Sequence, residues 1–231
     1  MTSLRIFILF ISILFISCNN DNTQKTEPTP KKPINYLALG DSYTIGQSVA
    51  ETKRFPVQLI DSLRGRDYLA NDAKIIAQTG WRTDNLMNAI IAEELTDTFD
   101  IVSLLIGVNN QFQGRTVEQY RAPFRELLEK AIELTGGDAT KVFVVSIPDY
   151  GVTPFGMTRN PEEIAEEIDE FNAANLEISD SLNVTYFNIT PISRQAENNP
   201  DLIANDGLHP SGEMYRLWVK LMLDEVENMV R

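Results

Sequence analysis

The feature that most constrains the fold is the alternation of short apolar runs with longer amphipathic segments from residue 34 onward. The run at 101–106 contains almost no polar residues, as expected for a strand that is buried on both faces of a parallel sheet. Runs of this kind predict five strands, at residues 34–39, 73–77, 101–106, 141–147 and 184–189. Amphipathic patterns predict helices at 56–64, 82–95, 117–134, from 160 onward and at 213–229.

Strands that alternate with helices form right-handed βαβ units around a parallel sheet. We therefore expect one α/β domain over residues 34–231, with a mostly parallel, five-stranded central sheet in the flavodoxin-like order, covered on both faces. No internal repeat or second domain is visible. Ligands of open sheets bind beyond the carboxyl ends of the strands, so the residues that follow each strand are the place to look for chemistry.

Composition excludes several classes of function. The 231 residues include one His and one Cys, which excludes an intrachain disulfide, a Cys-rich zinc site and a multi-His metal site. Neither a metal nor a cofactor is expected. The formal net charge of −13 disfavours binding to nucleic acid, whose phosphates attract Lys and Arg. If the chain is an enzyme that needs imidazole, only His209 can supply it.

The N-terminus has the pattern of a bacterial signal peptide. Arg5 precedes an apolar run at 6–16, which is shorter than the ~20 residues of a membrane-spanning helix. The sequence that ends at Cys18 resembles a lipobox, which predicts a signal peptide at 1–17 and a lipidated Cys18. Residues 18–33 are polar and Pro-rich, as in a flexible tether. We expect a cell-envelope protein held to the membrane by lipid alone, on the periplasmic or surface face; an ordinary cleaved signal is the alternative.

Polar residues follow each of the first three predicted strands. Gly40-Asp41-Ser42 follows the first, Gly80 follows the second and Asn109 follows the third. A fourth block, Asp206-Gly207-Leu208-His209, lies just before the last helix. If the first strand lies between the second and the third, as in the flavodoxin-like order, the first three blocks converge at one edge of the sheet.

These residues have the properties that acyl transfer requires. A Ser hydroxyl becomes a nucleophile when a base such as imidazole takes its proton, and an acid orients that base. Ser42, His209 and Asp206 can fill these three roles. The oxyanion of the tetrahedral intermediate needs fixed hydrogen-bond donors. The backbone N–H groups of Ser42 and Gly80 and the side-chain amide of Asn109 are donors of that kind.

Each block also has a purely structural interpretation. The first can be a tight turn with a capping Ser, and the others a strand-end turn, a loop amide and an Asp-Gly turn beside a structural His. Asp41 is the rival for the acid role, although its place beside Ser42 favours a structural turn, and we interpret Asp149 as structural too. The occurrence of all four blocks in this order favours acyl transfer.

The four blocks together resemble those of the SGNH hydrolases, also called GDSL esterases and lipases, from about residue 36 to the last helix. The resemblance implies a three-layer α/β/α fold, Ser42 as nucleophile, His209 as base and Asp206 as acid. It also implies an oxyanion hole of Ser42, Gly80 and Asn109. The chain departs from the family at Asn110, where Asp is usual.

The predicted function is hydrolysis of short acyl esters, such as acetyl groups on sugars or small alcohols. The side chains expected to wall the substrate pocket are Tyr43, Trp81, Tyr150 and Phe155, and the loop at 150–160 is expected to shape it. Two alternatives remain: a lysophospholipase or longer-acyl lipase, and a catalytically silent, glycan-binding lipoprotein. The expected partner is a small-molecule or glycan ester, and the sequence carries no signal about the oligomeric state.

Overall fold

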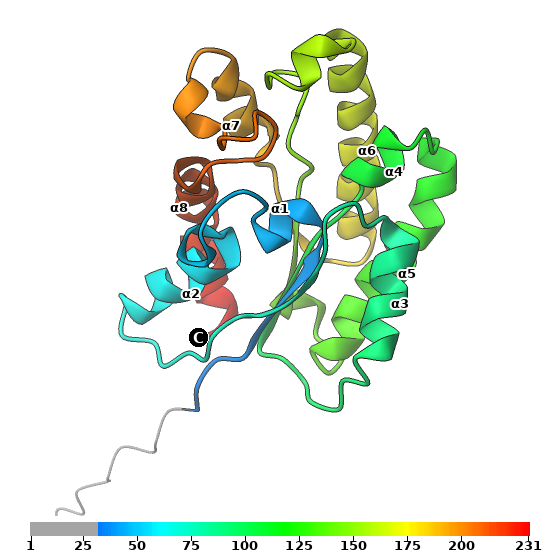
Figure 1. Cartoon of the computed structure of the whole chain (residues 1–231). Helices are drawn as coiled ribbons and strands as arrows, with labels where there is room; N and C mark the ends of the chain where they lie inside the picture. Colours follow the sequence, from blue (N-terminus) through cyan, green and yellow to red (C-terminus); the bar gives the residue numbers. More distant parts are fainter. Residues whose placement is uncertain (1–31) are drawn as a thin grey trace, which may run out of the picture. The chain divides into compact units, whose positions relative to one another are not determined.

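Five parallel strands form the central sheet of the computed structural model, which describes residues 32–231 (Figure 1). Their order across the sheet is β2-β1-β3-β4-β5, and every neighbouring pair is parallel. The flavodoxin-like order predicted from the sequence is therefore confirmed. The strands are β1 (Tyr36–Gly40), β2 (Lys74–Ala77), β3 (Ile101–Leu105), β4 (Val142–Val145) and β5 (Thr185–Phe187).

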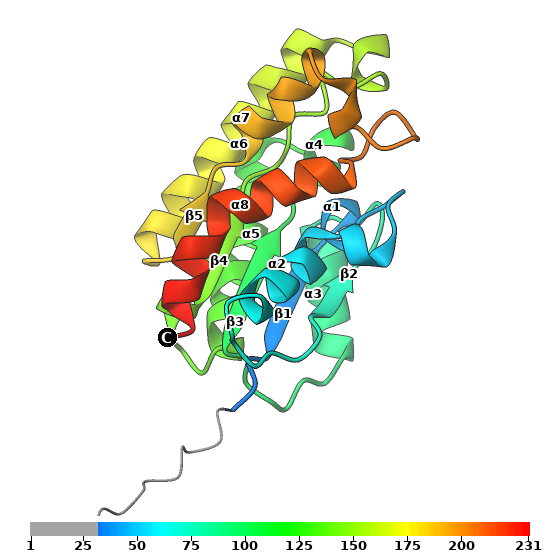
Figure 2. The same ribbon diagram turned by 90° about the vertical axis from the view of Figure 1, so that its left-hand side faces the viewer.

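Helices cover both faces of this sheet and make three layers (Figures 1 and 2). One face is covered by α2 (Phe55–Arg64) and α8 (Gly212–Met229), which pack against each other. The other face is covered by α3 (Thr83–Ala92), α5 (Val117–Leu134) and α6 (Pro161–Ser181). The three-layer α/β/α architecture is thus as expected.

Burial explains the apolar runs in the sequence. Every residue of β1, β3 and β4 is buried, because helices cover these strands on both sides. Between α2 and α8, the rings of Phe55, Tyr215 and Trp218 pack together with centroids 4.9–6.2 Å apart. Aromatic side chains of this size contribute much of the apolar area that is buried where the two helices pack together.

The long helices begin at capping residues that the sequence makes visible. Asn160 accepts a hydrogen bond from the backbone N–H of Glu163 at the start of α6, and Pro161 follows it as the first helical residue. Thr116 and Gln119 form a reciprocal capping box at the start of α5. The bounds of α5 agree with the predicted helix at 117–134.

Other predicted bounds were wrong by a few residues. The first strand begins at Tyr36, and Ile34 makes only an isolated bridge with Ala70. The fourth strand ends at Val145. Ile147 is also fully buried, so the apolar run in the sequence extends beyond the residues that pair with a neighbouring strand. The helix predicted at 82–95 is α3, which ends at Ala92.

Three short helices were not predicted: α1 (Ser42–Ile45), α4 (Val108–Phe112) and α7 (Thr190–Arg194). Short 3₁₀ helices occur at Glu51–Lys53, Ala139–Lys141, Gly156–Thr158, Gln195–Glu197 and Pro200–Leu202. Helices of four or five residues are too short to show a full period of side-chain pattern. Two of them, α1 and α4, directly follow β1 and β3 at the carboxyl edge of the sheet.

The predicted signal peptide, Cys18 and nearly all of the predicted tether lie outside the described residues. Residues 32–231 form one compact unit. No helix within that part of the chain is long and apolar enough to cross a membrane.

Candidate active site

The sheet order brings three of the predicted blocks to one edge. Strand β1 lies between β2 and β3, and its last residue, Gly40, is level with Ala77 and Leu105 of the two neighbours. The segments that follow these strands therefore emerge side by side. They carry Ser42 and Gly80 after the first two strands and Asn109 after the third.

Ser42 is the first residue of α1, and its surroundings explain the Gly-Asp sequence before it. A side chain at Gly40 would collide with the Thr44 side chain and with the backbone oxygen of Leu105, so only Gly fits. Asp41 caps the helix by accepting a hydrogen bond from the Tyr43 N–H at 3.0 Å. The N–H of Ser42 has no acceptor among residues 32–231, as expected at the start of a helix.

Asp41 lies in the core and is not part of the pocket wall. Its side chain is fully buried, and its Oδ2 has no hydrogen-bond partner in the described part of the chain. Burial raises the pKa of Asp41 to about 7, against a smaller lowering effect of the hydrogen bond from Tyr43. This location agrees with the structural turn role that the sequence favoured over the acid role.

Asp206 and His209 form a close pair in the loop before α8. His209 Nδ1 lies 2.6 Å from Asp206 Oδ2, and the N–H groups of Leu208 and His209 both donate to Asp206 Oδ1 at 3.0 Å. Ser48 Oγ donates to Asp206 Oδ2, also at 2.6 Å. The sequence analysis did not single out Ser48.

The hydrogen bonds to Asp206 fix the protonation of the pair. Partial burial raises the pKa of Asp206, but the hydrogen bonds from Ser48 and His209 outweigh this effect and hold it well below its usual range. An ionised carboxylate can only accept, so Nδ1 of His209 carries the proton. Nε2 of a neutral imidazole then keeps its lone pair. The ring of Tyr43 packs edge-on against the imidazole, with centroids 5.7 Å apart.

Two further donors lie on the same edge. Gly80 has a φ of +85°, a left-handed conformation that favours Gly, and its N–H has no acceptor among the described residues. Asn109 donates one amide hydrogen to the backbone oxygen of Trp81 at 3.0 Å. Because a side-chain amide has two hydrogens, the second is left to donate elsewhere.

A pocket of about 130 Å³ joins the predicted residues. Ser42, Gly80, Asn109 and His209 all line it, although Ser42 Oγ makes no hydrogen bond with any described side chain. Its walls are largely apolar and also include Tyr43, Thr79, Val108, Phe112, Tyr150, Phe155 and Leu208. Three of the four predicted wall residues are thus present. The fourth, Trp81, is not among the lining residues: it packs, partly buried, against the core, and its backbone oxygen accepts from Asn109.

Aromatic rings form the outer wall of the pocket. Phe112, Tyr150 and Phe155 have ring centroids 6.1–6.4 Å apart. The guanidinium of Arg159 lies 4.8 Å from the ring centroid of Phe112 and 4.7 Å from that of Phe155, within cation–π distance. The loop between β4 and α6, predicted to shape the pocket, therefore supplies two rings and a cation.

The family departure at Asn110 has a structural explanation. Asn110 is buried, and its Oδ1 accepts from the N–H of Thr83 at 3.2 Å while its Nδ2 donates to the Thr83 hydroxyl at 3.0 Å. It thereby caps the start of α3. Asp149, the other carboxylate considered from sequence, is buried in an ion pair of 2.9 Å with Arg194, as the structural interpretation expected.

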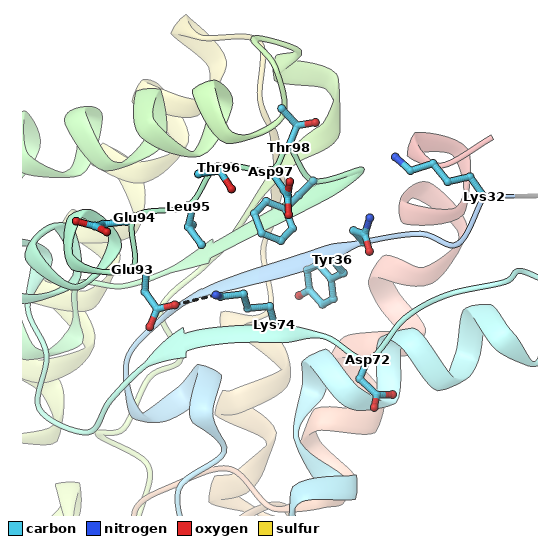
Figure 3. A pocket seen from close by; sticks show the side chains of 12 residues that line it. Lys32, Tyr36, Asp72, Lys74, Glu93, Glu94, Leu95, Thr96, Asp97 and Thr98 are labelled. Atoms are coloured by element: carbon cyan, nitrogen blue, oxygen red, sulfur yellow. Dashed lines mark ion pairs between the residues drawn. The ribbon is translucent and has the colours of Figure 1, made fainter.

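A larger cavity of about 620 Å³ lies at the opposite, amino-terminal end of the strands (Figure 3). Charged side chains dominate its lining, among them Lys32, Asp72, Glu94 and the ion pair of Lys74 with Glu93 at 2.7 Å. The lining contains neither Ser nor His. Despite its size, this cavity therefore lacks the Ser and His that the predicted chemistry requires.

Comparison with protein families identifies the chain. The model of the GDSL-like lipase/acylhydrolase family matches residues 38–217. The chain belongs to this family. The match begins within β1 and ends in α8, so it includes the other four strands in full and every residue of the pocket wall. Membership makes the protein a carboxylic ester hydrolase.

Solved structures of the family share the fold at low sequence identity. A protein from Parabacteroides merdae classed as a GDSL-like lipase is 21% identical, with a TM-score of 0.68 over 85% of this chain and 97% of that one. An acetyl xylan esterase from Geobacillus stearothermophilus is 15% identical, with a TM-score of 0.65 over 85% and 95%. A psychrotrophic esterase from Pseudoalteromonas is 17% identical, with a TM-score of 0.60 over 84% and 97%. The comparison with curated proteins gave no match.

Proposed function

We propose that the protein is a serine esterase that hydrolyses short acyl esters, with Ser42 as nucleophile, His209 as base and Asp206 as acid. The observation that carries this proposal is His209, which lines the same pocket as Ser42 and is joined to Asp206 behind it at 2.6 Å. An ionised Asp206 holds the Nδ1 proton and leaves Nε2 free to accept the proton of a nearby hydroxyl.

The reaction proceeds in two halves. Ser42 Oγ attacks the ester carbonyl carbon as Nε2 of His209 takes the hydroxyl proton, and the intermediate then expels the alcohol, which receives that proton. Water next attacks the acyl-enzyme on Ser42, with His209 again taking and returning a proton. Free acid leaves and Ser42 regains its hydrogen.

Three donors stabilise the oxyanion formed in each half. They are the N–H groups of Ser42 and Gly80, which have no acceptor within residues 32–231, and the remaining amide hydrogen of Asn109. Donors that are fixed before the reaction stabilise developing charge without reorganisation. The bond from Asn109 to the Trp81 oxygen and the left-handed turn at Gly80 supply that rigidity.

The size of the pocket supports a preference for esters with a short acyl group. Its volume of about 130 Å³ is well below the ~300–1,000 Å³ of pockets that take drug-sized ligands. The rings of Phe112, Tyr150 and Phe155, which pack together, occupy part of its lining. An acetyl or similarly small group fits such a space, and the alcohol part, a sugar or a small alcohol, then projects from the open side.

Nitrophenyl esters of increasing acyl length test this proposal. We expect hydrolysis of acetyl and butyryl esters with a higher kcat/KM than octanoyl esters, and loss of activity in Ser42→Ala. Ser62→Ala is a matched control, since its hydroxyl bonds only to the backbone oxygen of Gln58 on α2. A preference for octanoyl would instead support a longer-acyl lipase. Hydrolysis of no ester by folded protein would support the silent, glycan-binding alternative.

We also propose that the protein is a lipoprotein of the bacterial cell envelope, anchored through Cys18. This rests on the sequence, where the only Cys ends an apolar run of signal-peptide length. Labelling of cells with a palmitate analogue should tag the wild-type chain but not Cys18→Ala. Equal labelling of both would contradict the anchor.

A further inference from the structure

Ser48 is a side chain near the site to which neither the sequence nor the reaction scheme gives a role. Its hydroxyl donates to Asp206 Oδ2 at 2.6 Å, across 158 residues of sequence. That oxygen is the one that also bonds to His209 Nδ1 at 2.6 Å. Two donors therefore share a single carboxylate oxygen, while Oδ1 accepts the two backbone N–H groups of the turn.

The backbone at Ser48 is held in an uncommon conformation. Its φ is +67°, in the left-handed region that residues other than Gly seldom adopt. The loop that presents it is folded back on α1, because Gln47 N–H donates to Ser42 O at 3.0 Å and Val49 N–H donates to Gly46 O at 3.2 Å. Ser48 thus belongs to the segment that continues from Ser42, and it is exposed to solvent there.

The bond from Ser48 connects two parts of the site that are separate in sequence. One part is the segment at 41–49, which carries Ser42. The other is the loop at 204–209, which carries Asp206 and His209. A carboxylate with its acceptor sites filled in fixed directions cannot rotate, and the imidazole that it orients is then fixed as well.

We propose that Ser48 is a positioning residue, which locks the Asp206 carboxylate toward His209 and ties the acid–base loop to the nucleophile segment. This inference rests on the proposed function of the site. Ser48 does not touch the reacting atoms and acts through Asp206. Its removal should therefore lower kcat and leave KM nearly unchanged, because substrate contacts stay in place.

The single His of the chain gives a direct readout of this role. Proton NMR of the full chain should show one hydrogen-bonded imidazole Nδ1 proton, whose chemical shift depends on the charge of Asp206 Oδ2. Without the Ser48 hydroxyl, His209 is the only side-chain donor to Asp206 Oδ2. The hydrogen bond from Nδ1 then changes in strength, and the Nδ1 proton resonance shifts. Loss of the hydroxyl also removes one of the hydrogen bonds that hold the pKa of Asp206 below its usual range.

The experiment compares wild type with Ser48→Ala, Ser48→Gly and the control Ser62→Ala. Gly readily adopts a φ of +67°, so Ser48→Gly removes the hydroxyl without adding strain. We expect both Ser48 variants to shift the Nδ1 proton resonance and to lower kcat about tenfold, with KM within about twofold of wild type, since hydrogen bonds to charged groups are the stronger class. Ser62→Ala should match wild type.

An unchanged Nδ1 resonance in both Ser48 variants would overturn the proposal. A tenfold fall in kcat without that shift would also overturn it, since the loss would then not pass through the Asp206–His209 pair. If wild type hydrolyses no ester, the proposed function fails instead. The NMR comparison still decides whether Ser48 holds the pair, so the two failures are distinguishable.

Discussion

The buried carboxyl of Asp41 should make the stability of the protein fall as pH rises. Burial raises its pKa from 3.8 to about 7 in the folded chain, whereas the unfolded chain keeps the ordinary value. Between these two values the folded state binds the proton and the unfolded state does not. Stability from this group is therefore complete below about pH 4, declines as pH rises and is lost above about pH 7.

The magnitude follows from the size of the shift. A change of about 3 pKa units at about 1.4 kcal/mol each gives up to about 4 kcal/mol. The nearby phenols of Tyr43, Tyr120 and Tyr215 do not titrate in this range, because burial raises their pKa values well above the usual 10.0. The pH dependence assigned to Asp41 is thus separable from theirs.

Asp41→Asn isolates this effect. Asn can still cap α1 by accepting from the Tyr43 N–H, but it carries no charge at any pH. Urea unfolding of wild type and variant at pH 4.5 and pH 8 gives four free energies of unfolding. We expect the variant to gain about 3 to 4 kcal/mol relative to wild type between these two pH values. Parallel changes in the two proteins would refute the assignment of a raised pKa to Asp41.

Substitutions at three further residues test other parts of the site. Asn109→Ala should lower kcat by about 10²–10³ with little change in KM, measured with a nitrophenyl ester, because an oxyanion donor acts in the transition state. Asn110→Ala should cost about 1–3 kcal/mol in urea unfolding, since it leaves the buried N–H of Thr83 without an acceptor, whereas Asn110→Asp should cost less because its carboxylate still accepts. Arg159→Ala should raise kcat/KM for octanoyl relative to acetyl esters, because it uncovers the rings of Phe112 and Phe155 in the lining of the pocket; an unchanged ratio would show that Arg159 does not limit acyl length.

The sheet was predictable because its strands are short apolar runs with a helix after each, and three of them, β1, β3 and β4, are buried throughout. The run at 101–106 became β3, and the amphipathic pattern at 117–134 became α5 with the same bounds. Such runs report burial, which is a property of many side chains together. They do not report where strand pairing stops, and so β4 ends at Val145 while Ile147 remains buried.

The parts of the site that sequence reasoning missed depend on contacts between distant residues. Ser48 is an isolated Ser in a loop, and its partner Asp206 is 158 residues away. Trp81 follows a strand as expected of a pocket residue, but it packs against the core, and its backbone oxygen is the acceptor for Asn109. The sequence pattern around each of these residues gives no indication of either contact.

The second layer behind the pocket wall was also invisible in the sequence. Tyr150 donates to Gln111 Oε1 at 3.0 Å, and Gln111 Nε2 donates to Glu167 at 2.5 Å. This chain of bonds joins the loop after β4 to α4 and α6 and fixes the Tyr150 ring. The contact of Glu167 could not be predicted, because a single sequence does not show which carboxylate meets a buried amide.

Covalent labelling with a fluorophosphonate is the most direct test of the central claim, that Ser42 is an activated nucleophile. The reagent forms a stable ester with a Ser hydroxyl only where a base removes the proton. Peptide mass spectrometry of the labelled wild-type chain should place the adduct on Ser42, with no adduct in Ser42→Ala and much slower labelling in His209→Ala. Folded wild-type protein that stays unlabelled, or an adduct on another residue, would contradict the account.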